Sequence, residues 1–114
     1  MRLTSELFVS AQIRRAFTEG GAAFVVRRGA AQAGAIFVII DRLDGTADLY
    51  GPAPQTALAE RDQPGDRLFQ RIVDSGAASE IDARLEREKR FDPDLWVISI
   101  EDREGRCWLD IVDG

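Results

Sequence analysis

The sequence predicts a single α+β domain over residues 1–114, with two helices and a mainly antiparallel sheet of about six or seven strands. Three observations lead to this prediction. The chain has 114 residues, and 45% of them are hydrophobic, which fits one compact domain with a real core. Two segments show the apolar spacing of a helix. The remaining apolar runs are short and are separated by turns that contain glycine or proline.

The first predicted helix covers residues 3–21. Thr4 or Ser5 is placed to cap its start, because a hydroxyl group accepts a hydrogen bond from an otherwise unpaired backbone amide. Its apolar stripe consists of Val9, Ile13 and Phe17. Gly20–Gly21 ends the helix, since glycine adopts the left-handed conformation at little cost.

Two apolar runs after this helix predict strands, residues 23–28 (AFVVRR) and residues 35–40 (AIFVII). The second run is continuous and rich in β-branched residues, which is typical of a strand buried on both faces. The GAAQAG linker between the runs lacks the Lys and Ser/Thr of a phosphate-binding loop, and no GxGxxG motif is present. We therefore expect no nucleotide cofactor.

Asp44–Gly45 predicts a tight turn between the strand at 35–40 and the next apolar run. A two-residue loop gives the pairs Ile40 with Leu49 and Ile39 with Tyr50. A three-residue loop would instead set Ile40 against Asp48, a core position against a charge, so we predict the two-residue register. That register brings Asp41 opposite Asp48, a repulsion that solvent, an arginine or a cation would have to relieve.

The prolines of residues 50–55 take the chain out of the sheet. Pro-Gly within Gln63–Asp66 then predicts a second hairpin. Residues 67–73 are predicted to form a strand, although their apolar spacing also fits a helix and this alternative stays open. The second helix covers residues 79–91, ends before Pro93 and buries a thin stripe made of Ala78, Ile81 and Leu85.

A final hairpin with Glu104–Gly105 at its tip is predicted to pair Ile100 with Leu109 and Ile98 with Ile111. Cys107 then faces the core and is expected to be inert. Trp108 shares the opposite, mixed face with Ser99, Glu101 and Asp110. An aromatic side chain beside carboxylates suits contact with a cation or with a partner protein.

Composition excludes several classes of function. Charged residues make up 31% of the chain and the net charge is −5, which argues against nucleic acid as the main ligand. No secretory signal or membrane-spanning run is visible, so no membrane partner is expected. The single cysteine excludes an internal disulfide, and the cytoplasm is the predicted location.

The chain contains no histidine, so it cannot by itself build a Ser-His-Asp or Cys-His catalytic site. A bound metal would need carboxylate oxygens, which favours magnesium, calcium or manganese. The alternative function is therefore a carboxylate-dependent divalent-metal hydrolase. Its site would be built from Asp41, Asp48, Glu101 and Asp110, provided that the two hairpins are neighbours.

The main hypothesis is a module that associates with itself or binds another protein. Both faces of the strand at 35–40 need covering, and only two helices are available to do this. A homodimer burying Phe37, Ile39 and Tyr50 would supply the missing cover. Trp108 is the fourth candidate contact residue. A third hypothesis, a binder of a small ligand, requires a pocket.

Four segments resemble a known family: LTSEL at 3–7, RRG with AGAIFV at 27–38, DLYGPAPQ at 48–55, and RFDPDLWVISIED at 90–102. Together they are similar to short alphaproteobacterial proteins grouped as a domain of unknown function. The likeness spans nearly the whole chain. It implies a bacterial cytosolic protein and supplies neither an activity nor catalytic residues.

Overall fold

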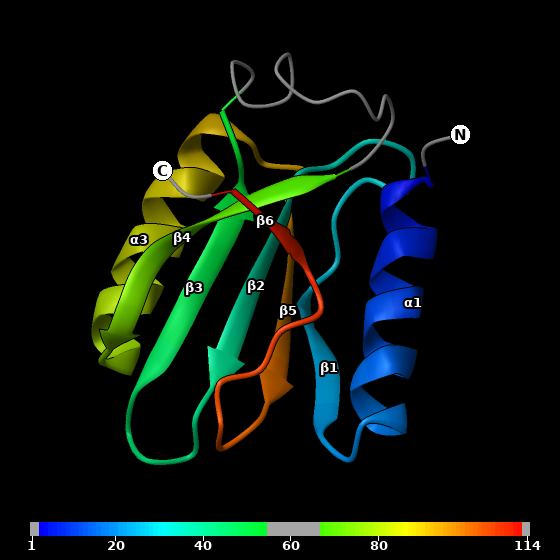
Figure 1. Ribbon diagram of the computed structural model, residues 1–114. Helices are drawn as coiled ribbons and strands as arrows, with labels where there is room; N and C mark the ends of the chain where they lie inside the picture. The colour runs from blue at the N-terminus through cyan, green and yellow to red at the C-terminus, as the bar shows by residue number, and fades with distance from the viewer. Residues whose placement is uncertain (1–2, 55–66, 113–114) are drawn as a thin grey trace.

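The structure, a computed structural model, describes residues 3–54 and 67–112, which form one six-stranded sheet and two helices (Figure 1). The elements are α1 (Ser5–Thr18), β1 (Ala22–Arg27), β2 (Ile36–Asp41), β3 (Ala47–Pro52), β4 (Leu68–Gly76), α3 (Ala78–Phe91), β5 (Trp96–Glu101) and β6 (Asp110–Ile111). Their order across the sheet is β1-β5-β2-β3-β4-β6. The predicted α+β class with two helices is confirmed for this part of the chain.

The sheet is mixed, so the prediction of a mainly antiparallel sheet is wrong. β2 runs parallel to β5, and β4 runs parallel to β6. The other neighbouring pairs are antiparallel. The β2–β5 pairing follows from α3, which connects β4 to β5 and lets the chain return across the sheet in the same direction (Figure 1). Turn residues in the sequence do not reveal a crossover of this kind.

The two faces of the sheet bury two separate core clusters. On the first face, here called the α1 face, α1 and the C-terminal segment cover Ile36, Val38, Ile40, Trp96, Ile98 and Ile100. On the opposite face, here called the α3 face, Ile81 and Leu85 of α3 cover Phe37, Leu49 and Val97. β2 and β5 are buried on both faces, as predicted for the run at 35–40. Among the described residues, no helix is both long and apolar enough to cross a bilayer.

The first helix forms as predicted, and the amide of Leu7 donates to the Thr4 hydroxyl over 3.3 Å at its N-cap. Val9 is buried as expected, at 2% exposure. Phe17 is 57% exposed, so its place in the buried stripe was wrong. The small Ala16 is fully buried beside it and lets the helix approach the sheet closely.

The strands at 23–28 and 35–40 are confirmed to within one residue as β1 and β2. Residues 68–73 lie in β4, so the strand predicted for 67–73 is confirmed to within one residue and the helical alternative is wrong. The second helix is confirmed as α3. The hairpin predicted around Gln63–Asp66 lies outside the described residues.

The register of the β2–β3 hairpin differs from the prediction. Ile40 lies opposite Asp48, and Ile39 lies opposite Leu49. The amide of Arg42 donates to the carbonyl of Thr46 over 3.1 Å, which leaves a three-residue loop. The sorting rule failed because Asp48 is a buried residue, with 0% exposure, and Arg42 compensates its charge. The predicted repulsion with Asp41 is therefore absent from this register.

The prediction of a C-terminal hairpin is also wrong. β5 has β1 on one edge and β2 on the other, so the segment after it has no free edge of β5 to pair with. After Glu101 the chain turns at Asp102, whose carboxylate accepts from the Arg106 amide over 2.7 Å and from its guanidinium over 2.8 Å. The hydrogen bond from Arg106 holds the pKa of Asp102 below its usual value. The chain then crosses the α1 face, where β6 joins β4 (Figure 1).

Candidate functional site

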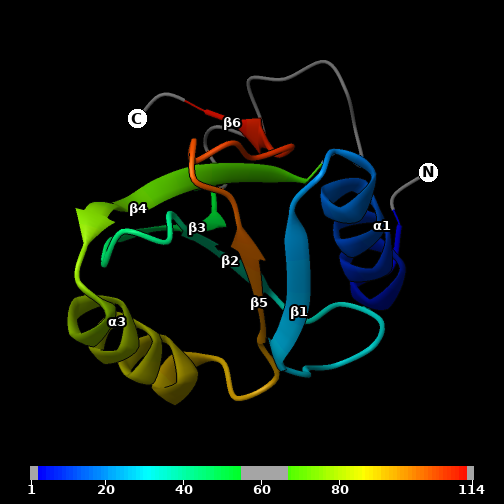
Figure 2. The same cartoon turned by 90° about the horizontal axis from the view of Figure 1, so that it is seen from below.

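α3 packs mainly against β3 and β4, as seen along the strands in Figure 2, and its Ile81 and Leu85 also reach the buried side chains of Phe37 in β2 and Val97 in β5. Over β2, β5 and β1, this face carries two adjoining hollows of about 400 and 430 Å³. Ile39 and Asp82 line both hollows, which we together call the α3 groove. Its apolar lining includes Val26, Ile39, Ala47, Ile81, Leu85 and Val97.

An exposed apolar stretch of β1 borders the α3 groove. Phe24 and Val26 are 51% and 53% exposed, whereas Val25, which is 39% exposed, pairs with Ile98 and so belongs to the α1 face. Phe24 pairs with Ser99, and Ser99 pairs with Ile39, so these three side chains stand in one row across the α3 face. Exposed large apolar side chains that gather beside a hollow are typical of an interaction surface.

Charges of both signs surround the α3 groove. Asp82, Glu86 and Lys89 line it from α3, and Arg27 lines it from β1. Lys89 lies 2.9 Å from Glu86, and its hydrogen bond is the main reason why the pKa of Glu86 is below its usual value. The guanidinium of Arg27 donates to the carbonyl of Leu95 over 2.6 Å, which fixes this charge at the edge of the groove.

Of the four contact residues that the sequence indicated, one lines the α3 groove. Ile39 is half-buried and lines both hollows. Phe37 and Tyr50 are buried within the single chain, at 4% and 2% exposure. Phe37 belongs to the cluster under α3, and Tyr50 to the cluster under the C-terminal segment. A surface between two chains therefore has to be built around Ile39 and the exposed residues of β1.

Trp108 lies on the other side of the sheet, half-buried against the core cluster of the α1 face. The guanidinium groups of Arg15 and Arg106 lie 6.0 and 5.8 Å from its ring centroid. The predicted face shared with Ser99 is wrong, because Trp108 is not in a strand paired with β5. Its cationic contacts come from this chain's own arginines, and its role in binding a partner remains a prediction.

The four carboxylates of the hydrolase hypothesis do not converge. Asp41 and Glu101 are neighbours in the β2–β5 ladder, whereas Asp48 lies on the opposite face and Asp110 in β6 beside β4. Across residues 3–54 and 67–112, no three acidic or cysteine side chains are arranged to hold a metal ion. The geometry therefore gives no support to a carboxylate-dependent hydrolase.

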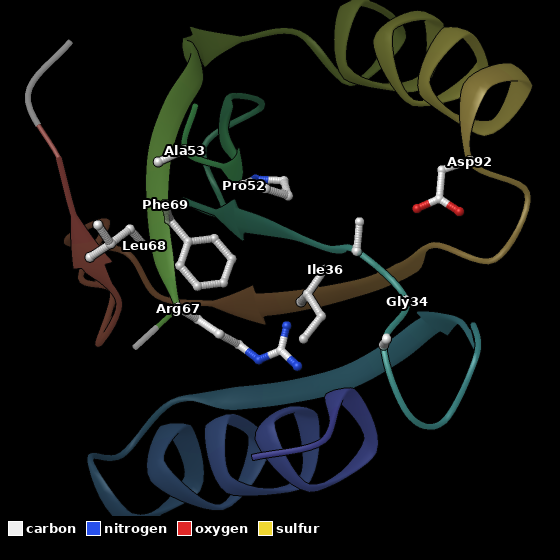
Figure 3. Close-up of a pocket in the computed structure, with 10 residues that line it drawn as sticks. Gly34, Ile36, Pro52, Ala53, Arg67, Leu68, Phe69 and Asp92 are labelled. Atoms are coloured by element: carbon white, nitrogen blue, oxygen red, sulfur yellow. The ribbon is translucent and has the colours of Figure 1, made fainter. Parts of the chain in front are cut away.

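A separate cavity of about 250 Å³ lies where β2 begins and β3 ends (Figure 3). The described residues that line it are Ala33, Gly34, Ala35, Ile36, Pro52, Ala53, Arg67, Leu68, Phe69 and Asp92. The side chain of Arg67 reaches into it, and Asp92 lies on the opposite side (Figure 3). We call this hollow the Arg67 cavity; it shares none of these lining residues with the α3 groove.

The start of α1 holds the guanidinium of Arg67 in place. Its Nη2 lies 3.0 Å from the carbonyl oxygen of Leu3 and 3.2 Å from Oγ of Ser5. The Phe8 ring lies below it, with 5.5 Å between the guanidinium carbon and the ring centroid. Ser5 is itself fully buried and donates to the carbonyl of Gly34 over 2.6 Å. The cation is thus anchored to two segments that border the cavity.

Sequence reasoning missed Arg67, because a charged residue just before a strand carries no signal of its own. The four sequence segments that resemble a known family gave an indirect signal. Three of the four contribute to the wall of the Arg67 cavity, with Ala33–Ile36, Pro52–Ala53 and Asp92. The fourth supplies the Leu3 and Ser5 contacts to the guanidinium.

Comparison with known proteins gives one family. The family model described as a protein of unknown function (DUF1491) matches residues 3–110. The solution structure of protein Atu0922 from Agrobacterium tumefaciens is similar, with 50% sequence identity and a TM-score of 0.86 over 100% of this chain and 98% of that one. A crystal structure of a DUF1491 protein from Caulobacter crescentus has 39% identity and a TM-score of 0.78, over 99% of this chain and 100% of that one. No curated protein matches the chain.

Proposed function

The chain belongs to the DUF1491 family of proteins of unknown function, and we propose that it is a self-associating module whose α3 groove receives Phe24 from a second copy. The observation that carries this proposal is the position of Phe24. Phe24 is 51% exposed and stands in the same row as Ser99 and Ile39, which line the groove.

The driving force is the burial of apolar surface. Moving one exposed phenylalanine side chain out of water contributes about 1.5–3 kcal/mol. A symmetric pair buries two such rings, together with Val26 and Ile39 of each chain. The hollow beside Val26 has a volume of about 430 Å³. It therefore offers room for an aromatic side chain without rearrangement of the core.

A two-fold symmetric arrangement follows from the position of the ring and the hollow on one face. When a protruding group and its receptor lie side by side, one rotation places each ring in the hollow of the other copy. A closed dimer results, with no free receptor left to extend the assembly. The α3 helix of a second copy does not fit this hollow, because its solvent-facing residues are mainly charged, including Asp82, Glu86 and Arg87.

The charges around the α3 groove suit the same arrangement. A two-fold rotation that brings β1 over the groove of the second copy moves Arg27 toward the acidic Asp82 and Glu86 of that copy. Opposite charges at the rim of an interface favour one orientation and exclude others, more than they add affinity. A rim of a single sign would instead repel its own copy.

Sedimentation equilibrium over a concentration series tests the proposal. The wild type is expected to show a reversible equilibrium between monomer and dimer. Phe24→Asp should weaken dimerisation about a hundredfold, because two buried rings are lost for each dimer. Phe17→Asp is the matched control, since Phe17 is 57% exposed on α1 and lies away from the groove. The proposal fails if the wild type stays monomeric at high concentration, or if both variants dimerise equally well.

We place this association in the cytoplasm. The support is the single cysteine of the chain, Cys107, which leaves no internal disulfide to form in an oxidising compartment. Cell fractionation of the native protein is the test, and recovery outside the cytosolic fraction would contradict the placement.

A further inference from the structure

We infer that the end of the α3 groove near Asp41 binds a small organic ammonium ion. Its charged group is held by Asp41 and Ser99, and its apolar part lies against Ile39 and Ile81. The site is the hollow of about 400 Å³ that these four residues line, here called the Asp41 hollow. One chain builds all of it, so the inference does not rest on self-association, in which Phe24 enters the neighbouring hollow.

Two carboxylates at this end of the sheet lie side by side without a counter-ion. Asp41 pairs with Glu101 in the β2–β5 ladder, and the alternation of side chains along each strand puts both on the α3 face. Within residues 3–54 and 67–112 neither forms an ion pair, and the same holds for Asp82, which lines the hollow from α3. Like charges on neighbouring strands repel each other, so a bound cation would relieve a repulsion that the fold leaves in place.

Ser99 supplies a separate observation that points to a ligand. It is only 6% exposed and lines the Asp41 hollow, yet its hydroxyl makes no hydrogen bond to any described residue. Buried polar groups normally have a partner, because an unpaired one lowers stability. Ser99 pairs with Ile39, and Asp41 follows Ile39 by two residues on the same face. Strand geometry then sets Ser99 and Asp41 about 8 Å apart, so that an ammonium group between them can donate to both.

The carboxylate of Asp41 is already oriented. Its Oδ1 accepts from the amide of Leu43 over 2.9 Å, and no described residue donates to its Oδ2. The side chain is half-buried, so its attraction for a cation is screened less than at an open surface. Across the described ranges no three acidic side chains are arranged to hold a metal ion. An organic ammonium needs no such cage, because it binds by hydrogen bonds and apolar contact.

The wall of the Asp41 hollow suits a hydrocarbon group. Ala47 and Ile81 are buried, and Ile39 is half-buried. The described lining residues include no basic side chain, whereas Arg27 and Lys89 line the neighbouring hollow. Hollows of this size hold small molecules by apolar contact and a few fixed polar groups. The charge and the lining together favour an amine with a small hydrocarbon group over an alcohol or a carboxylate.

Benzylamine, which is protonated at neutral pH, is the probe. The full chain is titrated at constant pH and low ionic strength, and backbone amide chemical shifts are followed. Benzyl alcohol and benzoate share its ring without the positive charge, and ammonium chloride supplies the charge without the ring. We expect saturable shifts at Asp41, Thr46 and Ser99 with benzylamine and much weaker responses with the other three. Benzyl alcohol, benzoate or ammonium binding as tightly as benzylamine would overturn the assignment.

The same titration in Phe24→Ser separates this inference from self-association. The variant loses the ring that the proposed dimer buries, and it adds no charge next to the hollow. Benzylamine should bind it as tightly as it binds the wild type, whether or not the wild type dimerises. Binding that disappears in Phe24→Ser would contradict a site built by one chain.

Two variants remove the contacts of the charged group one at a time. Asp41→Asn removes the charge but keeps an oxygen for the Leu43 amide, and it should weaken benzylamine about tenfold or more. Ser99→Ala removes only the hydroxyl and should weaken binding about fivefold. Asp94→Asn, at an exposed position before the start of β5, removes the same charge far from the hollow and should bind like the wild type. Wild-type affinity in both hollow variants would refute the site.

Discussion

Arg42 Nη2 lies 2.7 Å from Asp48 Oδ2 on the α1 face, and this pair fixes how β2 and β3 align. Asp48 is fully buried, and its other carboxylate oxygen accepts from the amide of Ser75 over 2.8 Å. Ser75 has a φ of 54°, in the left-handed region that few residues other than glycine adopt. One carboxylate thus joins the β2–β3 loop to the end of β4.

Replacing Asp48 with alanine should lower the free energy of unfolding by about 2–4 kcal/mol, because charge-assisted hydrogen bonds are lost and the amide of Ser75 loses its acceptor. Urea unfolding followed by circular dichroism measures this loss. Asp44→Ala is the control on the same hairpin, since Asp44 is exposed and bonds only within the loop, to Thr46. The role assigned to the buried pair is wrong if both variants are equally stable.

Burial raises the pKa of Tyr50 above its ordinary value of 10.0, while the hydrogen bond from Arg71 partly offsets this rise. Below pH 10.0 the phenol is neutral in both the folded and the unfolded chain, so its contribution to stability is complete. Above that pH the unfolded chain ionises first, and the free energy of unfolding should fall until the folded pKa is passed.

Tyr50 is the only tyrosine, so the near-ultraviolet absorbance of phenolate reports on it alone. In the folded protein the midpoint of this titration should lie above 10.0. Tyr50→Phe is the companion variant for unfolding experiments, and it should lose less stability than the wild type as the solution becomes more alkaline. A midpoint at or below the ordinary value would contradict the burial of this hydroxyl.

Gly29→Ala should destabilise the fold by about 2 kcal/mol or more, because the added carbon has no room. It would lie 2.2 Å from the carbonyl oxygen of Asp94 and 2.6 Å from the carbonyl carbon of Leu95, and backbone atoms cannot move aside easily. Gly45→Ala is the contrasting variant. Its added carbon meets nothing within 4 Å, so only its φ of 91° opposes the change, by about 1 kcal/mol.

Thermal or urea unfolding of the two alanine variants separates these causes. The indole N–H of Trp96 donates to the carbonyl of Ala30 over 2.8 Å, so its resonance should shift in Gly29→Ala and stay unchanged in Gly45→Ala. A Gly29→Ala protein as stable as Gly45→Ala would show that the loop does not rest on the Asp94–Leu95 backbone.

Features that depend on neighbouring residues could be predicted from the sequence. The cap at Thr4, the buried Ile81 and Leu85 of α3, and the β-branched run of β2 all follow from local spacing. Each of these features has a local cause: an unpaired amide at a helix start, an amphipathic helix face, or a strand buried on both sides. Each cause involves only a few consecutive residues. The two helices and the strands β1, β2 and β4 were therefore predicted at nearly their observed positions.

Features that depend on distant residues could not be predicted. The burial of Asp48 could not be foreseen, because the hydrogen bond that its carboxylate accepts from the amide of Ser75, 27 residues later, leaves no trace in the sequence. β5 was paired with the segment after it because nothing in its own pattern shows that β1 and β2 occupy both its edges. Sorting apolar from charged side chains fails where a buried charge has a partner.

The residues of the candidate sites also fall into those that the sequence could predict and those that it could not. Ile39 was identified because a strand with two apolar faces needs cover on both. The exposure of Phe24 could not be foreseen, because it depends on where α3 packs on the sheet (Figure 2). The position of Arg67 depends on its contacts with Leu3 and Ser5 at the start of α1, more than 60 residues earlier in the chain.

The account rests most on the proposal that Phe24 of one chain enters the α3 groove of another. Isotope-filtered nuclear Overhauser spectra, recorded on a mixture of labelled and unlabelled wild-type chains, test this directly. We predict contacts between chains from the Phe24 ring protons to the methyl groups of Ile39 and Leu85. Contacts between chains that involve Phe17 or Leu7 of α1 instead, or none at concentrations where a dimer sediments, would contradict it.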